Sequence, residues 1–354
     1  DRWFLPWSCI MNQRVYVGMS GGVDSSVTAA LLQEQGYDVT GVYMKNWSQD
    51  LPGMKCPWAE DLADAKRVAV QLGIDFKVFD FEREYKQKVV DYMVKEYKAG
   101  RTPNPDIMCN QEVKFKLFLD ASLEDGADLI ATGHYARTKN GQLQRARDAG
   151  KDQTYFLYRV THGALAKTLF PLEDYLKSDV RDMARARGLW TAQKKESMGV
   201  CFVGNVGMRE FLSNYVTTQP GDVIEKETGE KVGRHDGAIF YTLGQRHGLD
   251  VGGGLPYYVV GKDMAKNEVY VSRNIQDNNL VRRIVTLSSI HWIDSAPDHG
   301  DKLQARIRHR GQLIDATLRD AVVELASAER AITPGQSVVL YNGDTCLGGG
   351  IVTV

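Results

Sequence analysis

The chain has 354 residues, of which 43% are apolar and 25% charged, a composition typical of globular proteins with two or three domains. This composition excludes a mainly disordered chain. No apolar run approaches the roughly 20 residues that span a bilayer, so we expect no membrane partner. The formal net charge of −1 argues against a globally basic nucleic-acid binder, although a local basic face is compatible with it.

The start of the chain is apolar but too short and interrupted for a secretory signal. We expect Met11 to be the natural start and residues 1–10 to be a tag or an upstream extension.

A glycine- and serine-rich loop, SGGVDSS at residues 20–26, separates a short apolar strand from a helical pattern. A strand that turns through glycines into a helix leaves unpaired N–H groups around one point, and the helix N-terminus adds to this anion site. No Gly-Lys-Ser/Thr closes the loop, so it is not a Walker motif. It resembles the loop with which PP-loop ATP pyrophosphatases hold the pyrophosphate end of ATP; the alternative is a serine-capped helix after a turn.

The first half of the chain alternates predicted strands and helices. Strands are predicted at 39–44, 76–81 and 128–132, and helices at 59–72, 85–97, 114–123 and 180–188. This alternation favours a doubly wound parallel sheet with helices on both faces. Ligands of such sheets bind beyond the carboxyl ends of the strands, so the SGGVDSS loop, Met44, Lys45 and residues 132–134 are expected to converge on one ligand.

Two cysteines lie in settings that favour the thiolate. Cys109 follows a proline-rich loop and precedes the helix predicted from Lys114, so a helix N-terminus would lower its thiol pKa; Asp106, three residues earlier, is a candidate acid/base. Cys201 is flanked by glycines and preceded by a lysine pair. For each thiol the alternative is a buried structural cysteine. With an ATP loop, the two suggest sulfur transfer, in which one thiol carries a persulfide and the other attacks it to close a disulfide.

The other cysteines carry no such signal. The total of five is odd and includes no Cys-x-x-Cys pair or His/Cys cluster, so we expect no tightly bound structural metal and a reducing, cytoplasmic location. Cys56 and Cys346 are expected to be structural.

The character of the sequence changes after about residue 207. Glycines become frequent and short apolar runs alternate with polar residues, which is typical of an all-β region. We predict a catalytic domain at 11–206, a small central β-rich domain at 207–275 and a C-terminal β-barrel at 276–354. Arg306, Arg308 and Arg310 alternate along a predicted strand, as either a phosphate-contacting stripe or a solvated strand face.

A series of motifs along the chain carries a more specific resemblance. They are SGGVDSS (20–26), GRTPNPD (100–106) with Cys109-Asn110, ATGHY (131–135), KDQTYFL (151–157), the Cys201 segment, YTLGQR (241–246) and TPGQ (333–336). Together, and in this order, they resemble the tRNA-specific 2-thiouridylases of the MnmA family over nearly the whole chain from Met11. Glu196 and Met198 depart from the Asp and Thr expected before the persulfide cysteine, which affects local hydrogen bonding and not the reaction.

The resemblance implies 2-thiolation of the wobble uridine of tRNA. ATP, with Mg²⁺, would adenylate the C2 oxygen, and a persulfide on Cys201 would deliver sulfur as AMP leaves. Cys109 would be the second catalytic cysteine, forming a transient disulfide with Cys201, and Asp106 an acid/base. The implied partners are the tRNAs for Lys, Glu and Gln and a sulfur donor, either a relay protein or a cysteine desulfurase.

The resemblance also assigns binding residues. ATP would be held by Gly18, Met19, Ser20, Gly21, Gly22, Val23, Asp24, Ser25, Met44 and Gly133, with Asp24 orienting Mg²⁺ on the phosphates. The flipped target base would be surrounded by Asn104, Pro105 and Asp106. The tRNA would be touched by His134, Lys151, Asp152, Gln153, Arg308, His309 and Gln336. Without the motif around it, His134 would be interpreted as capping a strand end.

Two other functions remain as alternatives. Another PP-loop ligase, such as an amidating synthetase, would need no partnership of Cys109 with Cys201 and would draw ammonia from a glutaminase domain, which the sequence does not show. A non-enzymatic ATP-sensing RNA-binding module would bind tRNA without converting ATP to AMP and pyrophosphate.

Overall fold

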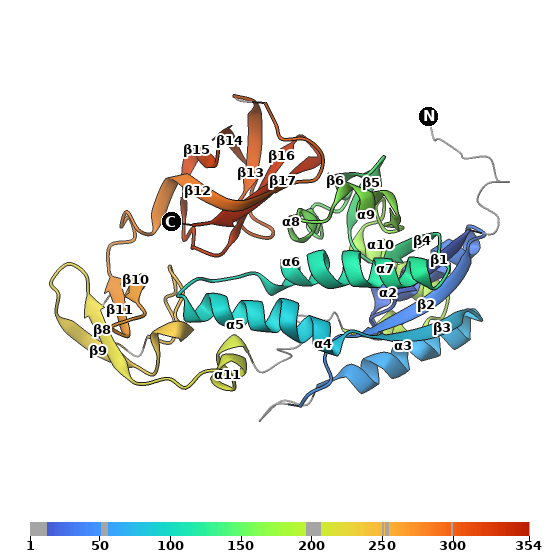
Figure 1. Ribbon diagram of the computed structural model, residues 1–354, viewed down its shortest axis with the longest axis horizontal. Coiled ribbons are helices and arrows are strands. Elements are labelled where there is room, and N and C mark those ends of the chain that lie inside the picture. Colours follow the sequence, from blue (N-terminus) through green and yellow to red (C-terminus); the bar gives the residue numbers. More distant parts are fainter. Residues whose placement is uncertain are drawn as a thin grey trace.

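The computed structural model describes residues 13–50, 56–195, 207–249, 251, 255–298 and 300–353. Cys201, Glu196, Met198 and Cys9 lie outside these ranges. The parallel sheet, the central β-rich sheet and the C-terminal barrel are three separate sheets, and two long helices lie below the barrel and the short helices beside it in Figure 1.

The N-terminal sheet is parallel throughout, with the strand order β3-β2-β1-β4-β7. Its strands are β1 (Arg14–Gly18), β2 (Asp38–Lys45), β3 (Asp75–Asp80), β4 (Leu129–Thr132) and β7 (Thr168–Leu169). Side chains alternate between the two faces, so Val15 and Val17 pack with α2 (Val23–Glu34), α3 (Trp58–Leu72) and α10 (Lys177–Ala186). Tyr16 packs on the opposite face with the long helices, which confirms the doubly wound sheet.

Each long helix is built from three consecutive helical segments. The first comprises α4 (Glu82–Tyr85), the π-helical η1 (Lys86–Val90) and α5 (Asp91–Lys98); the second comprises α6 (Pro105–Cys109), the π-helical η2 (Asn110–Leu117) and α7 (Phe118–Glu124). The second helix begins at Pro105 and not near Lys114, because Asn104 caps it by accepting hydrogen bonds from the N–H groups of Asp106 (3.1 Å) and Ile107 (3.3 Å). Proline suits this first helical position, where its missing N–H has no partner to lose. Cys109 therefore lies within the helix, near its N-terminal end, and the prediction that it precedes a helix starting near Lys114 was wrong.

Shorter elements complete the N-terminal half. They are β5 (Ala136–Lys139), β6 (Gln142–Arg145), α8 (Thr154–Leu157), α9 (His162–Ala166), η3 (Trp190–Gln193) and α11 (Met208–Ser213). The β5–β6 hairpin extends the barrel sheet, because β6 pairs with β17 in the register Thr345↔Gln144 and Cys346↔Leu143. The sequence analysis did not predict this hairpin.

The central sheet has the strand order β10-β11-β8-β9. Its elements are β8 (Gly221–Glu225), β9 (Lys231–His235), η4 (Ala238–Phe240), β10 (Tyr258–Asp263) and β11 (Glu268–Ser272). Valines and aromatic residues fill its small separate core.

The C-terminal barrel is closed, because β12 pairs with both β15 and β17 at the two ends of the order β12-β15-β14-β13-β16-β17. Its strands are β12 (Val281–Trp292), β13 (Lys302–Arg306), β14 (Ile314–Arg319), β15 (Val322–Arg330), β16 (Ser337–Asn342) and β17 (Thr345–Val352). Strand β13 ends at Arg306, which is buried, whereas Arg308 and Arg310 lie in the following turn. The predicted strand face of three arginines was therefore wrong.

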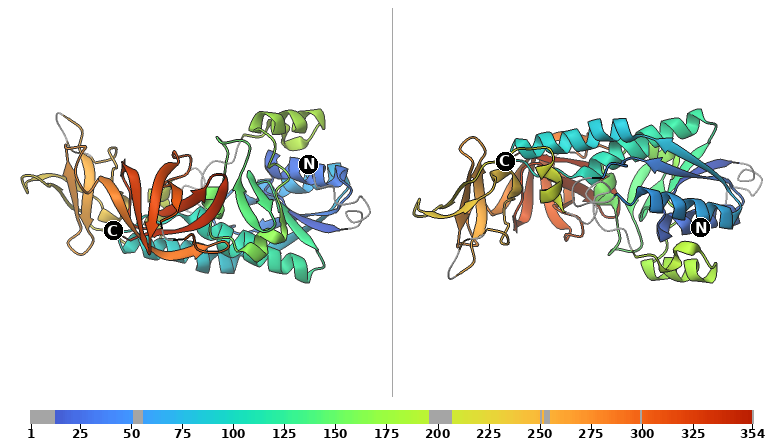
Figure 2. Two further views of the ribbon diagram at one scale, coloured as in Figure 1. Left: turned by 90° about the horizontal axis from the view of Figure 1, so that it is seen from above. Right: turned by 90° about the horizontal axis from the view of Figure 1, so that it is seen from below.

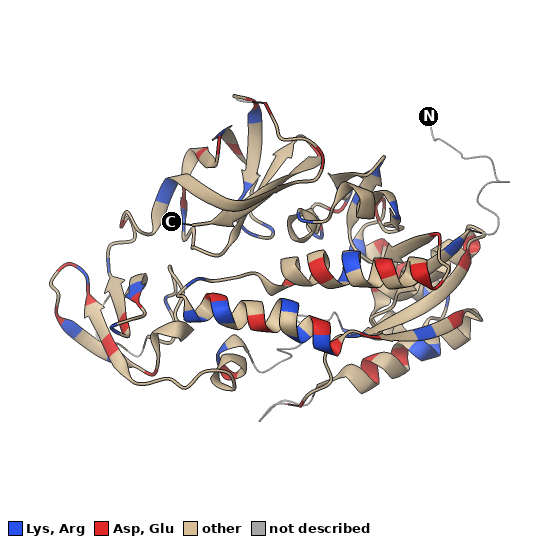
Figure 3. Ribbon diagram, in the orientation of Figure 1, with Lys and Arg blue, Asp and Glu red and all other residues tan. Residues whose placement is uncertain are grey.

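The molecule is elongated, and the barrel lies between the central sheet and the N-terminal domain in both views of Figure 2. Basic and acidic residues are interspersed along the long helices and α3 (Figure 3), in keeping with the near-zero net charge. No helix in the described ranges has both the length and the hydropathy needed to cross a membrane.

Candidate active site

The SGGVDSS loop follows β1 at the carboxyl end of the parallel sheet and leads into α2. Gly22 is the extended N-cap residue of α2, and Gly21 adopts a φ of +72°, which favours glycine. The Ser26 hydroxyl donates to the Gly22 carbonyl at 2.8 Å and accepts from Thr191 at 2.9 Å. The Ser25 hydroxyl accepts from the Ser20 N–H at 3.2 Å. These bonds fold the loop back on itself, while Ser20 is exposed.

Glycines let three other segments approach this loop closely. A Cβ on Gly21 would lie 2.4 Å from the Asp61 carbonyl oxygen at the start of α3, and one on Gly133 would lie 2.9 Å from the Asp24 carbonyl carbon and the Ser25 nitrogen. A Cβ on Gly18 would lie 3.0 Å from Met44 Cε. The structure thus brings the ends of β1, β2 and β4 together around the loop, along with the residues predicted to hold ATP.

The contact at Gly133 makes a direct prediction. In Gly133→Ala the new methyl group would push the loop away from β4, so we expect binding of a non-hydrolysable ATP analogue to weaken by about tenfold. The measurement is calorimetric titration of the full chain. Gly163→Ala is the matched control, because no atom lies within 4 Å of its added Cβ; equal weakening in both variants would contradict the prediction.

The loop carboxylate Asp24 has a basic partner that the sequence analysis missed. Lys177 Nζ, at the start of α10, lies 2.5 and 2.6 Å from the two carboxylate oxygens, and the Tyr135 hydroxyl donates to the same carboxylate at 3.0 Å. The Lys177 side chain is 11% exposed and that of Asp24 32%. Asp24 and Lys177 are separated by 153 positions, so no local pattern reveals the pair. Among the described residues, no group of His, Cys, Asp and Glu is assembled for a metal ion.

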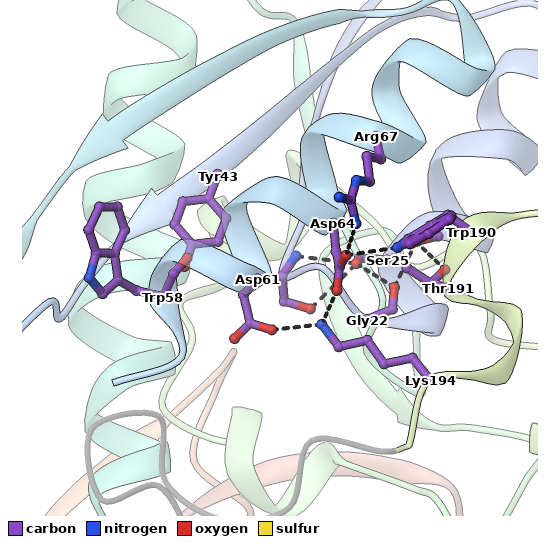
Figure 4. Close-up of polar contacts among 12 residues, drawn as sticks. Gly22, Ser25, Tyr43, Trp58, Asp61, Asp64, Arg67, Trp190, Thr191 and Lys194 are labelled. Atoms are coloured by element: carbon purple, nitrogen blue, oxygen red, sulfur yellow. Dashed lines mark hydrogen bonds and ion pairs between the residues drawn. The ribbon is translucent and has the colours of Figure 1, made fainter. Parts of the chain in front are cut away.

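A second lysine is held on the other side of the loop by α3. Lys194 Nζ lies 2.8 Å from Asp61 and 2.7 Å from Asp64, and Trp190 Nε1 donates to Asp64 at 2.8 Å (Figure 4). Burial lowers the pKa of Lys194, but its bonds to the two carboxylates outweigh this and leave the pKa raised. Lys194 was expected to favour a thiolate at Cys201. Its positive charge is instead balanced by the Asp61 and Asp64 carboxylates of α3.

Cys109 and Asp106 lie on adjacent turns of the second long helix. Cys109 is buried, with 3% of its surface exposed, and the π-helical segment begins at the next residue. Burial raises the pKa of the Asp106 carboxyl, and Lys114 partly offsets this. Asn104 Oδ1 is committed to capping the helix, and Pro105 is buried behind it. A carboxyl with a raised pKa on the same helix as a thiol is suited to proton transfer.

His134 lies at the end of β4. Its Nδ1 is 2.8 Å from the Thr132 hydroxyl, and its ring packs against Phe115 and Phe170. Burial lowers the pKa of His134 well below its usual value, with a further contribution from Lys114. The imidazole is therefore neutral at physiological pH.

The residues expected to touch tRNA fall into two groups. Lys151 and Gln153 are half-buried, and Gln153 Oε1 accepts from the Tyr135 N–H at 2.9 Å. Asp152 differs: its side chain is 1% exposed and lies 2.6 Å from Arg306 Nη1. In this structure the Asp152 carboxylate does not reach the surface, so the expected tRNA contact by this side chain is not available.

The barrel supplies the other three expected tRNA residues. Arg308 is exposed and lies 3.4 Å from Glu329. His309 is half-buried with its ring centroid 4.4 Å from that of Phe156, and Gln336 is half-buried beside Ser337. His309 meets α8 directly, so its ring lies at the junction of the barrel and the N-terminal half.

Comparisons with known proteins cover most of the chain. Family models match a "tRNA methyl transferase HUP domain" at residues 13–205, a "tRNA methyl transferase PRC-barrel domain" at 209–273 and an "Aminomethyltransferase beta-barrel domain" at 282–352. Proteins named tRNA-specific 2-thiouridylase MnmA are similar over nearly their full length: that of Bacillus subtilis is 47% identical over 351 residues, and that of Halalkalibacterium halodurans 49% over 350, each covering 96% of this chain and 94% of the relative. A 4-thiouridine synthetase–RNA complex with bound ATP matches at a TM-score of 0.39 and 16% identity, covering 57% of this chain and 50% of that one, a likeness too weak to carry an argument.

Proposed function

The chain belongs to the MnmA family of tRNA-specific 2-thiouridylases, sulfurtransferases that act on tRNA uridine, and on that premise we propose how its site performs the reaction. The matched family models carry methyl-transferase descriptions, but the relatives over the whole chain are named for thiolation. The single observation that carries the proposal is the combination of the glycine loop at the sheet edge with Asp106 and Cys109 on one helix.

In the proposed reaction, the wobble uridine C2 oxygen attacks the α-phosphate of ATP and pyrophosphate leaves. The terminal sulfur of a Cys201 persulfide then attacks C2, and AMP departs with the former C2 oxygen. The Cys109 thiolate attacks Cys201 Sγ, so that the Cys109–Cys201 disulfide forms and 2-thiouridine is released. An external thiol reductant restores both cysteines.

Roles for the other residues follow from their places around the site. We propose that residues 18–25, Met44 and Gly133 hold ATP, with Mg²⁺ on its phosphates near Asp24. Asn104, Pro105, Asp106 and His134 would contact the base; Lys151, Gln153, Arg308, His309 and Gln336 would contact the tRNA. The proposed substrates are the tRNAs for Lys, Glu and Gln, and a cytoplasmic relay protein or cysteine desulfurase supplies the sulfur.

The proposal is tested by mass spectrometry of tRNA nucleosides after incubation of the full chain with tRNA, ATP, Mg²⁺ and a sulfide or desulfurase source. We expect 2-thiouridine together with stoichiometric AMP and pyrophosphate. AMP without thiolated nucleoside would indicate another ligase, and tRNA binding without AMP would indicate a binding module; either result would overturn the proposal.

The raised pKa of Asp106 predicts the pH dependence of the reaction. As a base, Asp106 must be ionised, so the acidic limb of kcat/KM should lie above the ordinary aspartate pKa of about 3.9. Asp106→Asn should lower kcat/KM by about 10²–10⁴-fold and remove that limb. The measurement is a pH–rate profile, with Asp120→Asn on the exposed face of α7 as control; an unchanged acidic limb in Asp106→Asn would count against the role.

The same raised pKa predicts a pH-dependent stability. Between the ordinary and the raised pKa the folded protein keeps a proton on Asp106 that the unfolded chain loses. The contribution of Asp106 to the free energy of unfolding therefore falls as pH rises through that window. This loss should be absent in Asp106→Asn when thermal unfolding is followed across the window.

A further inference from the structure

A short segment between β6 and α9 is anchored deep in the barrel. The Asp152 carboxylate pairs with Arg306 Nη1 at 2.6 Å, with side chains 1% and 7% exposed. The Thr154 hydroxyl lies 2.9 Å from the Asp152 carboxylate and 3.1 Å from the Tyr341 hydroxyl. An ion pair this buried requires both partners, because removing either leaves an uncompensated charge away from water.

Two tyrosines of the same segment fix its helix α8 to the barrel. The Tyr155 hydroxyl donates to the carbonyl oxygens of Ser337 (2.9 Å) and Ile307 (3.2 Å). The Tyr158 hydroxyl lies 3.0 Å from Ser337 Oγ. Both tyrosines are buried, so these polar contacts are shielded from water. They fix the position of α8 against the barrel.

Helix α8 also contacts the helix that carries Cys109. Asn110, the residue after Cys109, is 2% exposed and donates from Nδ2 to the Phe156 carbonyl oxygen at 3.1 Å. The barrel also contacts the approach to this helix, where the Thr102 N–H donates to the Pro334 carbonyl at 2.8 Å. A Cβ on Gly335 would lie 2.8 Å from the Thr102 nitrogen, so the barrel backbone is in close contact there.

From these contacts we infer that the barrel positions Cys109 through α8, and that Asp152, Arg306 and Tyr155 are positioning residues for that thiol. The inference rests on the proposed function, and it replaces the tRNA contact expected for Asp152. The barrel thus has a second role beside any contact with RNA. It fixes the position of the Cys109 thiol, which belongs to the N-terminal half of the chain.

The test compares Asp152→Asn with Leu318→Ala in the full-length protein. Leu318 is buried in the barrel's own core, so its truncation destabilises the barrel without touching the ion pair or α8. The first readout is the rate at which iodoacetamide alkylates Cys109, followed by mass spectrometry of its peptide. We expect the alkylation rate to rise about tenfold in Asp152→Asn and not comparably in Leu318→Ala. Local opening should expose the Cys109 thiol only when the contacts that hold α8 to the barrel are lost.

The second readout is the split between kcat and the tRNA KM in thiolation. Asp152→Asn should lower kcat by about tenfold with the tRNA KM unchanged. Arg306→Met should lower kcat by a similar factor, and Arg306→Lys, which keeps the positive charge beside Asp152, should lose less. Unchanged alkylation, an equal rise in Leu318→Ala, or a raised tRNA KM with unchanged kcat would overturn the inference. If Asp152→Asn does not fold, Tyr155→Phe replaces it in both measurements.

The two readouts also separate this inference from the proposed function. Alkylation of Cys109 needs neither tRNA nor ATP. A wild-type protein that fails to thiolate would refute the function while the alkylation comparison still decides whether the barrel positions Cys109.

Discussion

Replacing Cys109 with serine is expected to reduce tRNA thiolation by at least about 10³-fold, while ATP is still cleaved once per bound tRNA. Adenylation of the C2 oxygen precedes sulfur transfer and needs no thiol, so pyrophosphate should appear as a single burst. A serine hydroxyl cannot exchange with the disulfide between Cys201 and the base, so 2-thiouridine is not released. Rapid-quench measurement of pyrophosphate alongside mass spectrometry of the nucleosides separates the two steps.

Cys346→Ala is the matched control for that experiment. Cys346 is buried in β17, and burial raises its pKa far above the ordinary thiol value, so it is chemically inert. The Cys346→Ala variant should thiolate tRNA at the wild-type rate. Cys201→Ser should lose thiolation as completely as Cys109→Ser and still bind ATP; normal product formation in either catalytic variant would refute the proposed sulfur transfer.

Replacing Lys177 with methionine is expected to raise the KM for ATP by about 10²-fold. The Asp24 carboxylate, now without its cation, would face the incoming phosphates and repel them; a 10²-fold change corresponds to about 2.8 kcal/mol. Methionine is close in size to the aliphatic part of lysine and lacks the charge, so most of the packing is retained. Steady-state kinetics with ATP varied at saturating tRNA and Mg²⁺ gives the measurement.

The double variant Asp24→Asn/Lys177→Met distinguishes two roles for Asp24. If Asp24 chiefly balances Lys177, removing both charges should bring the KM for ATP most of the way back toward wild type. If Asp24 orients Mg²⁺, the double variant should stay impaired, and Asp24→Asn alone should lose kcat and its Mg²⁺ dependence. A wild-type KM in Lys177→Met would show that the ion pair has no part in ATP binding.

Local patterns predicted much of the fold. Helix α3 ends where a glycine follows the last periodic residue, and Gly73 indeed adopts the left-handed conformation at its C-cap. The start of the second long helix was missed because the two prolines indicated a loop, whereas Pro105 follows the cap Asn104 and begins the helix. Strands β2, β3 and β4 and the glycine loop after β1 were recoverable because each depends on neighbours in sequence.

The parts of the site that escaped prediction depend on distant pairs. Neither Lys177 beside Asp24 nor Lys194 beside Asp61 follows from a nearby pattern, because each pair joins elements more than a hundred positions apart. Asp152 was assigned to the tRNA contact by the resemblance of its motif to the family. Its burial results from an arginine 154 positions later in the chain, and sequence alone does not show that the two meet.

The hairpin of β5 and β6 has a consequence for how the chain is made. Its partner strand β17 follows β6 by about 200 residues, so at typical rates of 5–20 residues per second a ribosome needs about 10–40 s to deliver it. During that interval the edge of β6 that later pairs with β17 is unpaired and open to other nascent chains. Completion of the barrel sheet is therefore a late step of folding. A chain that leaves the ribosome before β17 is synthesised would keep the hairpin without its partner strand.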